Sequence, residues 1–312
     1  MQTDNNIKSI KYNPSKIFRE YGTNIYITKK ERTNRMQFRT SIIYAGLFME
    51  ELPIFHLYKH DLYLNGIQPD DHSYRLAHAC SKAFYPLVVI CSAGNEIYAI
   101  RDDLLKSRWA ELRPAIEREF AGESAERYIK ATENNLYDKE KIQDLINKDI
   151  FFFLFFSLKY GYIQEKEERE IKLPLLAFEK AVSGKFSTKF HISEDNNLSV
   201  ILEGSITDET LFNYATLLNT FSNEEAGKVT GNFTIIYQLD KDYLIDSIKA
   251  DFHIKKENKE ALFDITLESY YLSEYPLKPV NDTDTIALGK EIENQQKTIN
   301  KKSFWKKLQE YF

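Results

Sequence analysis

The stretch Asn232-Phe-Thr-Ile-Ile-Tyr-Gln-Leu-Asp-Lys-Asp-Tyr-Leu-Ile-Asp-Ser-Ile-Lys-Ala-Asp-Phe-His253 decides the fold class of this chain. It contains two runs rich in β-branched and aromatic residues, separated by the polar turn Asp240-Lys-Asp242. This is the pattern of two antiparallel strands. Because side chains two residues apart point to the same face of a strand, one face carries Phe233, Ile235, Tyr237 and Leu239, joined across the turn by Ile245, Ile248, Ala250 and Phe252. We expect an antiparallel sheet with one buried face.

The segments around this hairpin continue the pattern. A third long strand is predicted over residues 260–271, and two shorter strands are predicted over 186–192 and 198–206. Apolar residues recur every three or four positions between 211 and 221, which predicts one helix.

The amino-terminal half mixes strands with helices. Strands are predicted over residues 35–50 and 53–60, and a hairpin is predicted over 87–101 around the turn Ala93-Gly-Asn95. Asp71 is a candidate N-cap for a helix that ends before Pro86.

A helical block is expected from about residue 102 to 160. Pro114 should kink or split its first helix, because proline lacks the backbone N–H and clashes with the preceding turn. A later helix begins near Asp138 and runs into the aromatic cluster Phe151–Phe156. That cluster is apolar all round, so its helix should be enclosed by other elements.

The predicted fold class is α+β, with antiparallel sheets, a central helical block and a tethered C-terminal amphipathic helix. The charge run over residues 164–170 is the best candidate for a domain boundary. The predicted parts are an irregular amino-terminal arm (1–34), an α+β domain (35–162), a mostly antiparallel β domain (171–273), a linker (274–289) and the C-terminal helix (290–312).

Composition excludes several classes of protein. The chain has 312 residues, 43% of them hydrophobic, and a formal net charge of -5, which argues against a nucleic-acid-binding protein. The amino terminus lacks the basic and apolar regions of a signal peptide, and no apolar run is long enough to span a bilayer. We therefore expect a cytoplasmic protein in which Cys80 and Cys91 are reduced, buried thiols, and we expect no cofactor.

The C-terminal segment is the most informative candidate site. Phe304, Trp305, Leu308, Tyr311 and Phe312 lie within one broad face of a predicted helix, and lysines lie away from it. This spacing fits a helix that docks in the groove of another protein. One alternative is that the helix packs back on its own domain, and another is that it lies on a membrane surface.

Histidines and carboxylates gather between residues 50 and 78, and such side chains are ligands for zinc or iron. His56 and His60 would project from the same side of a strand but about 13 Å apart, which is too far to share one metal. No zinc-protease motif, nucleophile elbow or phosphate-binding loop is present. The members of the cluster are Glu50, Glu51, His56, His60, Asp61, Asp70, Asp71, His72 and His78.

These observations favour a non-catalytic cytoplasmic binding protein, such as a chaperone or adaptor, or an immunity-type protein, for a secreted toxin or a component of a secretion machine. Its partner would be another protein, bound through the C-terminal helix. One alternative is a hydrolase-like enzyme that uses the cluster at 50–78. Another is a carrier of an apolar ligand in a curved sheet. No sequence pattern fixes an oligomeric state.

Overall fold

A computed structural model describes residues 7–29, 31–175, 181–192, 197–206, 229–256 and 261–274. Its helices are the short 3₁₀ helix η1 (Pro14–Lys16), α1 (His72–Ser81), α2 (Asp102–Glu119), α3 (Glu123–Leu136), α4 (Lys139–Asn147) and α5 (Ile150–Ser157). Its strands are β1 (Ile7–Ile10), β2 (Phe18–Lys29), β3 (Arg32–Phe48), β4 (Leu52–Leu64), β5 (Leu87–Cys91), β6 (Ile97–Ile100), β7 (Gly161–Gln164), β8 (Arg169–Leu173), β9 (Val182–Ile192), β10 (Leu198–Ile206), β11 (Val229–Leu239), β12 (Ile245–Lys256) and β13 (Ala261–Glu274).

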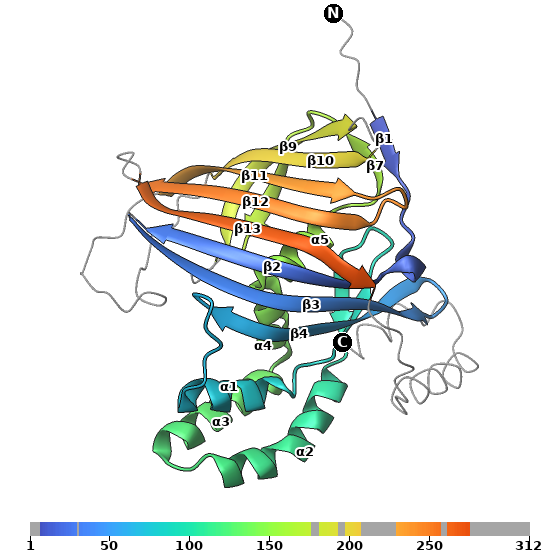
Figure 1. Ribbon diagram of the computed structural model, residues 1–312. Helices are drawn as coiled ribbons and strands as arrows, with labels where there is room; N and C mark the ends of the chain where they lie inside the picture. Colours follow the sequence, from blue (N-terminus) through green and yellow to red (C-terminus); the bar gives the residue numbers. More distant parts are fainter. Residues whose placement is uncertain are drawn as a thin grey trace, which may run out of the picture.

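One large antiparallel sheet organises the described residues, as the α+β prediction requires. Its 11 strands follow the order β6-β5-β4-β3-β2-β13-β12-β11-β10-β9-β8. Strands β2 and β13 pair in the middle, so the first and second halves of the sequence meet there (Figure 1). The sheet therefore contains strands from both of the predicted domains and does not divide at the charge run. Strand β1 pairs separately with β7.

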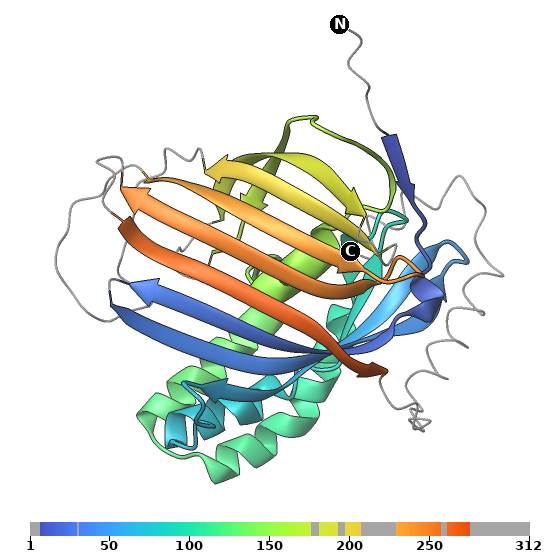
Figure 2. The same ribbon diagram turned by 45° about the horizontal axis from the view of Figure 1, so that its top comes forward.

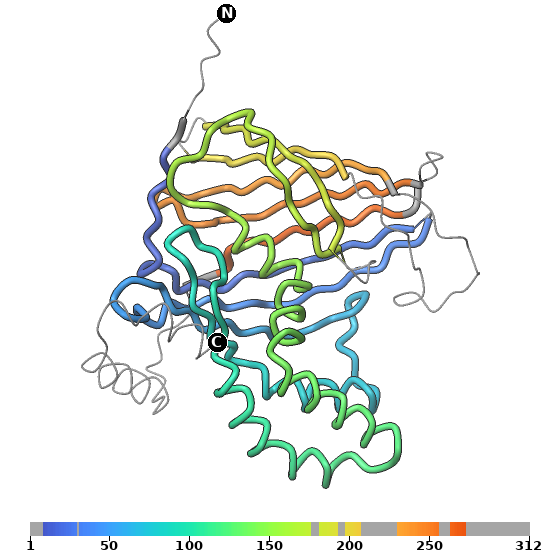
Figure 3. Tube along the Cα trace, turned by 180° about the vertical axis from the view of Figure 1, so that it is seen from behind, coloured from blue at the N-terminus to red at the C-terminus, as the bar shows by residue number. Residues whose placement is uncertain are grey.

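The concave face of the sheet is filled by α5. Figure 2 shows the strands curving around this helix, and the view from behind in Figure 3 shows α4 and α5 lying against the sheet. Phe151 and Phe155 contact Tyr21 of β2 with ring centroids 5.8 and 5.7 Å apart. From β11, on the same face of the sheet, the Tyr237 hydroxyl donates to the Leu154 carbonyl oxygen at 2.9 Å. The prediction that the aromatic helix is enclosed is confirmed.

The predicted helix that begins at Asp138 is in fact two helices. Asp138 caps α4 and accepts hydrogen bonds from the backbone N–H groups of Glu140 and Lys141. The chain then turns at Asp149, whose carboxylate accepts from the N–H groups of Phe151 and Phe152 and begins α5. Such caps satisfy N–H groups that have no partner within the helix.

Several other sequence predictions can be checked directly. Asp71 caps α1 as predicted, by accepting from the Tyr74 N–H at 3.0 Å. Of the two predicted effects of Pro114, a split of the helix does not occur, because α2 runs from Asp102 to Glu119 through this residue. Cys80 and Cys91 are buried, free thiols. Among the described helices, none combines the length and the apolar character that a membrane crossing requires.

The prediction that residues 1–34 are irregular is wrong for β2, which is 12 residues long. Its apolar alternation is concealed because polar side chains point into the core. Arg19 and Thr23 are 9% and 2% exposed. Thr23 shares a 3.0 Å hydrogen bond with Ser269 of β13, so burial leaves this hydroxyl satisfied.

Candidate functional site

The residues predicted to bind a partner, 304–312, lie outside the described residues, as do the predicted linker after residue 274 and the helix predicted over 211–221. The structure therefore leaves the C-terminal docking prediction untested.

The histidines and carboxylates between residues 50 and 78 do not converge. His60 lies on β4 with Nε2 3.7 Å from Glu20, whereas His72 of α1 packs on Phe120 and His78 packs on Tyr74. Within the part of the chain that the structure describes, no three His, Cys, Asp or Glu side chains are grouped so as to hold a metal ion. Asp71 of this cluster is occupied as a helix cap.

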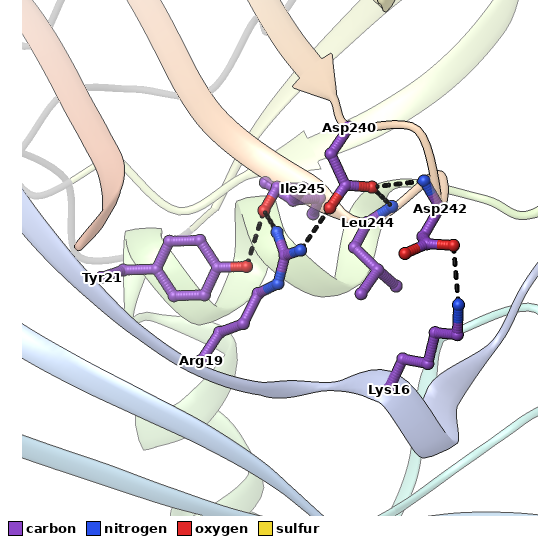
Figure 4. Close-up of polar contacts among 7 residues, drawn as sticks. All are labelled: Lys16, Arg19, Tyr21, Asp240, Asp242, Leu244 and Ile245. Carbon is purple, nitrogen blue, oxygen red and sulfur yellow. Dashed lines mark hydrogen bonds and ion pairs between the residues drawn. The ribbon is translucent and has the colours of Figure 1, made fainter. Parts of the chain in front are cut away.

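A cluster of polar side chains lies where β2 meets the β11–β12 turn (Figure 4). Arg19 donates to the Ile245 carbonyl oxygen at 2.8 Å and pairs with Asp240. The Tyr21 hydroxyl donates to the same carbonyl at 2.8 Å, and Lys16 pairs with Asp242 at 2.7 Å.

The contacts of this cluster indicate a structural role. Each charge in it faces an opposite charge, and Asp240 also accepts from the backbone N–H groups of its own turn. Burial raises the pKa of Tyr21, so its phenol stays protonated and donates a hydrogen bond. None of the drawn side chains of this cluster is an unpaired nucleophile. The cluster fixes the β11–β12 turn to β2.

A different feature has the character of a binding site. An open cavity of about 220 Å³ lies between α1, α4 and the start of α5. We refer to it as the α4 pocket. Its walls are mostly apolar, and Leu145 on its rim is 45% exposed. The pocket is lined by Ser81, Phe84, Tyr85, Leu87, Ile142, Leu145, Ile146, Asp149 and Phe152.

The carboxylate of Asp149 is the only charged group in this lining. One oxygen of this carboxylate accepts from the N–H groups that begin α5, at 3.1 Å each. The other pairs with Lys59 of β4, whose ammonium group lies 3.9 Å from the centroid of the Phe38 ring. The side chains of Lys59 and Asp149 are only 25% and 15% exposed. The ion pair is therefore held between the core and the pocket.

Tyr85 supplies the second polar group. Burial, followed by the nearby charge of Asp149, raises the pKa of the Tyr85 phenol. The phenol therefore stays neutral near pH 7 and can donate a hydrogen bond. Ser81 adds little, because its hydroxyl already donates to the His78 carbonyl oxygen at 2.8 Å.

Two other cavities differ in character. One, of about 550 Å³ between α2 and α3, is lined by Arg113, Glu117 and Glu133, which are joined in ion pairs. A second of about 550 Å³ lies beside α4 and β8 and has Asp144, Lys148 and Lys172 in its lining. The α4 pocket is distinguished from both by its apolar walls.

Sequence reasoning missed the α4 pocket, because its walls come from three segments that only the fold brings together. One signal was present in α4. The periodicity placed Ile142, Leu145 and Ile146 on one face, yet the structure buries only Ile142 and Ile146. Leu145 is therefore an apolar residue at the edge of that face.

Comparisons with known proteins add little to this geometry. No model of a protein family matches the chain, and no curated protein matches it. A search of solved structures returns the crystal structure of a protein of unknown function from the DUF3598 family of Nostoc punctiforme PCC 73102. The two chains are 6% identical, and the match covers 84% of this chain and 100% of that chain with a TM-score of 0.12. So low a TM-score carries no argument about fold or function.

Proposed function

We propose that this protein is a non-catalytic binding protein whose α4 pocket receives one aromatic side chain of a protein partner. The observation that carries the proposal is the size and lining of the pocket. A cavity of about 220 Å³ is smaller than the roughly 300–1,000 Å³ of typical small-molecule sites. It is larger than the roughly 150 Å³ cavity that takes a single benzene ring.

The position of α5 argues against the alternative of a carrier that holds an apolar ligand in the curved sheet. The concave face, where such a ligand would lie, is occupied by α5, and Phe151, Phe155 and Leu154 of this helix are buried there. A single protein side chain matches the remaining space at the α4 pocket. Anchor residues of protein interfaces fill pockets in this way.

The polar groups favour an aromatic anchor with a hydrogen-bonding end. Asp149 accepts hydrogen bonds and the protonated Tyr85 phenol can donate one, so the indole N–H of tryptophan or the hydroxyl of tyrosine has a partner of the right kind on entering. A purely aliphatic anchor would desolvate these two groups without replacing the hydrogen bonds that they make to water, which costs free energy.

The wider role stays as the sequence suggested, namely a cytoplasmic chaperone or adaptor, or an immunity-type protein. Two observations support this role. Cys80 and Cys91 are buried as free thiols, which suits a reducing compartment. The chemically reactive side chains between residues 50 and 78 are spread over β4 and α1 and do not form one catalytic arrangement.

The proposal can be tested with fragments that stand in for the anchor. Indole and p-cresol carry the ring and the donor of tryptophan and tyrosine, whereas toluene carries the ring alone. In an NMR titration we expect indole or p-cresol to shift resonances of Leu145, Ile146 and Phe152 with a Kd of about 1 mM, which corresponds to roughly −4 kcal/mol. Toluene should bind more weakly.

A matched pair of variants separates the pocket from general surface binding. Leu145 and Leu64 are 45% and 44% exposed, and only Leu145 lines the pocket. Leu145→Glu should weaken indole binding about tenfold or more, and Leu64→Glu should leave it unchanged. If no fragment bound near Leu145, or if Leu145→Glu bound indole as well as the unchanged protein, the proposal would be wrong.

A further inference from the structure

The carboxylate in the α4 pocket has an acceptor position that the described residues leave open. A carboxylate offers about four such positions. On Asp149, two of them accept from the N–H groups that begin α5. A third faces the ammonium group of Lys59. The remaining position belongs to a cavity with apolar walls and the partly exposed Leu145 at its rim, so an indole N–H that enters there can donate to Asp149.

The chain contains its own candidate for this position. It has two tryptophans, and Trp109 of α2 is fully buried. The other is Trp305, which belongs to the apolar face predicted for the C-terminal segment. We propose that Trp305 occupies the α4 pocket of its own chain. This inference rests on the proposed function, because it names the aromatic side chain that the pocket holds when no partner is bound.

The strand register relates the last described residue to the pocket. Glu274 of β13 lies opposite Arg19 of β2, and Arg19 lies opposite Ile42 of β3. The same row continues through Leu57 of β4 to Leu87 of β5, and Leu87 lines the pocket. Four strand-to-strand steps of roughly 4.8 Å each, or about 19 Å along the sheet, therefore separate residue 274 from the pocket wall.

The chain beyond residue 274 is long enough to make the contact. The predicted linker has about 15 residues, and a flexible chain of that length has a root-mean-square end-to-end distance of roughly 21 Å. A helix from residue 290 to Trp305 would add about 22 Å. Together these lengths exceed the distance along the sheet and allow for a path around its edge. A linker of this kind gives Trp305 an effective concentration on the order of 1 mM at the pocket.

The predicted helix offers a second contact at the rim of the pocket. Leu308 follows Trp305 by three positions, so on a helix the two side chains lie on one face. Leu308 can therefore cover the exposed part of Leu145 while the indole enters the cavity. With this contact we expect a local Kd of about 0.2 mM, about fivefold tighter than the value of about 1 mM expected for free indole. At an effective concentration of about 1 mM, Trp305 would then fill the pocket roughly 80% of the time.

Occupation in cis would regulate the capture of a partner. An aromatic side chain of the partner can enter only while Trp305 is outside the pocket, so the partner's apparent affinity falls about sixfold. A partner that also binds residues 304–312 removes this competition. The pocket and the C-terminal segment would then act together in one interface.

Indole titrations of the full chain and of its variant Trp305→Ala test the occupation directly. We expect the variant to bind indole about sixfold more tightly than the full chain, because its pocket is open. The Kd of about 1 mM for indole then applies to the variant. Equal dissociation constants would overturn this inference and leave the proposed function intact. Binding of indole near Leu145 in neither protein would overturn both.

Quenching of tryptophan fluorescence by iodide gives an independent readout in the full chain. Trp109 is fully buried, so the quenchable signal reports on Trp305. We expect Leu145→Glu to raise the quenching of Trp305 several-fold, because a charge at the rim opposes entry of the indole. Leu64→Glu, at a residue of matched exposure outside the pocket lining, should leave the quenching unchanged.

Three results would overturn docking in cis. One is equal quenching of Trp305 in Leu145→Glu and in the unchanged protein. Another is shielding of Trp305 that grows with protein concentration, which would show exchange of the segment between copies of the chain. The third is shielding that requires phosphatidylglycerol vesicles, which would show that the segment lies on a membrane surface.

Discussion

The ion pair at the floor of the α4 pocket gives the sharpest prediction about stability. Asp149→Asn keeps a side-chain oxygen that can accept from the N–H groups of Phe151 and Phe152, and it removes the charge that pairs with Lys59. Exposed ion pairs contribute about 0–1 kcal/mol, whereas removing one partner of a buried pair costs about 3–5 kcal/mol. With side chains 25% and 15% exposed, the pair lies between these limits, and we expect a loss of about 2 kcal/mol.

Two further variants divide this loss into its parts. Asp149→Ala also removes the cap of α5, which adds about 1 kcal/mol. Lys59→Met keeps an apolar chain near the Phe38 ring and leaves Asp149 with its two backbone donors, so its cost should be only about 1 kcal/mol. The double variant Lys59→Met/Asp149→Asn should lose less than the sum of the single changes, by about 1–2 kcal/mol.

Urea unfolding followed by circular dichroism measures each free energy, provided that the slope m stays constant. The reasoning would be refuted by strict additivity, within about 0.3 kcal/mol, of the two single changes. It would also be refuted if Asp149→Asn and Asp149→Ala were equally stable, because the helix cap would then contribute nothing.

Three further predictions concern the core. Phe151→Ala should lower the free energy of unfolding by about 4 kcal/mol, because this fully buried ring fills the concave face; Tyr162→Ala, at a residue that is 83% exposed, should change it by less than about 0.5 kcal/mol. Burial raises the pKa of Tyr21, Tyr160 and Tyr237, so their contribution to stability should be constant below about pH 10, and stability should fall above it, where unfolding lets these phenols ionise; ultraviolet absorbance should show their ionisation only together with unfolding. Burial also raises the pKa of the Cys80 and Cys91 thiols, so a thiol reagent at about pH 8 should label neither cysteine in the folded protein and both after unfolding; rapid labelling without unfolding would contradict the buried positions.

The sequence predicted local elements well wherever pattern and capping agreed. The alternation over residues 232–253 predicted β11 and β12, and Asp71 and Asp138 predicted helix starts. Strand β2 was not predicted over its full length because Arg19 and Thr23 occupy inward-facing positions, where an amphipathic strand normally carries apolar residues. Their partners, Asp240 and Ser269, lie more than two hundred residues away in the sequence, so no local signal could reveal that these polar groups are satisfied.

The candidate site was harder to predict for the same reason. Tyr85, Leu145 and Asp149 all line the α4 pocket. Asp149 is in turn paired with Lys59, which lies on β4. Single-sequence patterns report which face of an element is apolar, but they do not report which elements meet.

The central position of the β2–β13 pair has a consequence for biosynthesis. Ribosomes deliver β2 long before β13, so β2 would have an unsatisfied edge while more than two hundred further residues are being made. Such an edge is a template for pairing with other nascent chains. The two outermost strands of the finished sheet are short, with 4 residues in β6 and 5 in β8, whereas the edge left open during translation belongs to a strand of 12 residues. Translation arrested before residue 261 should therefore yield aggregation-prone chains, even though the completed protein keeps this long edge in its interior.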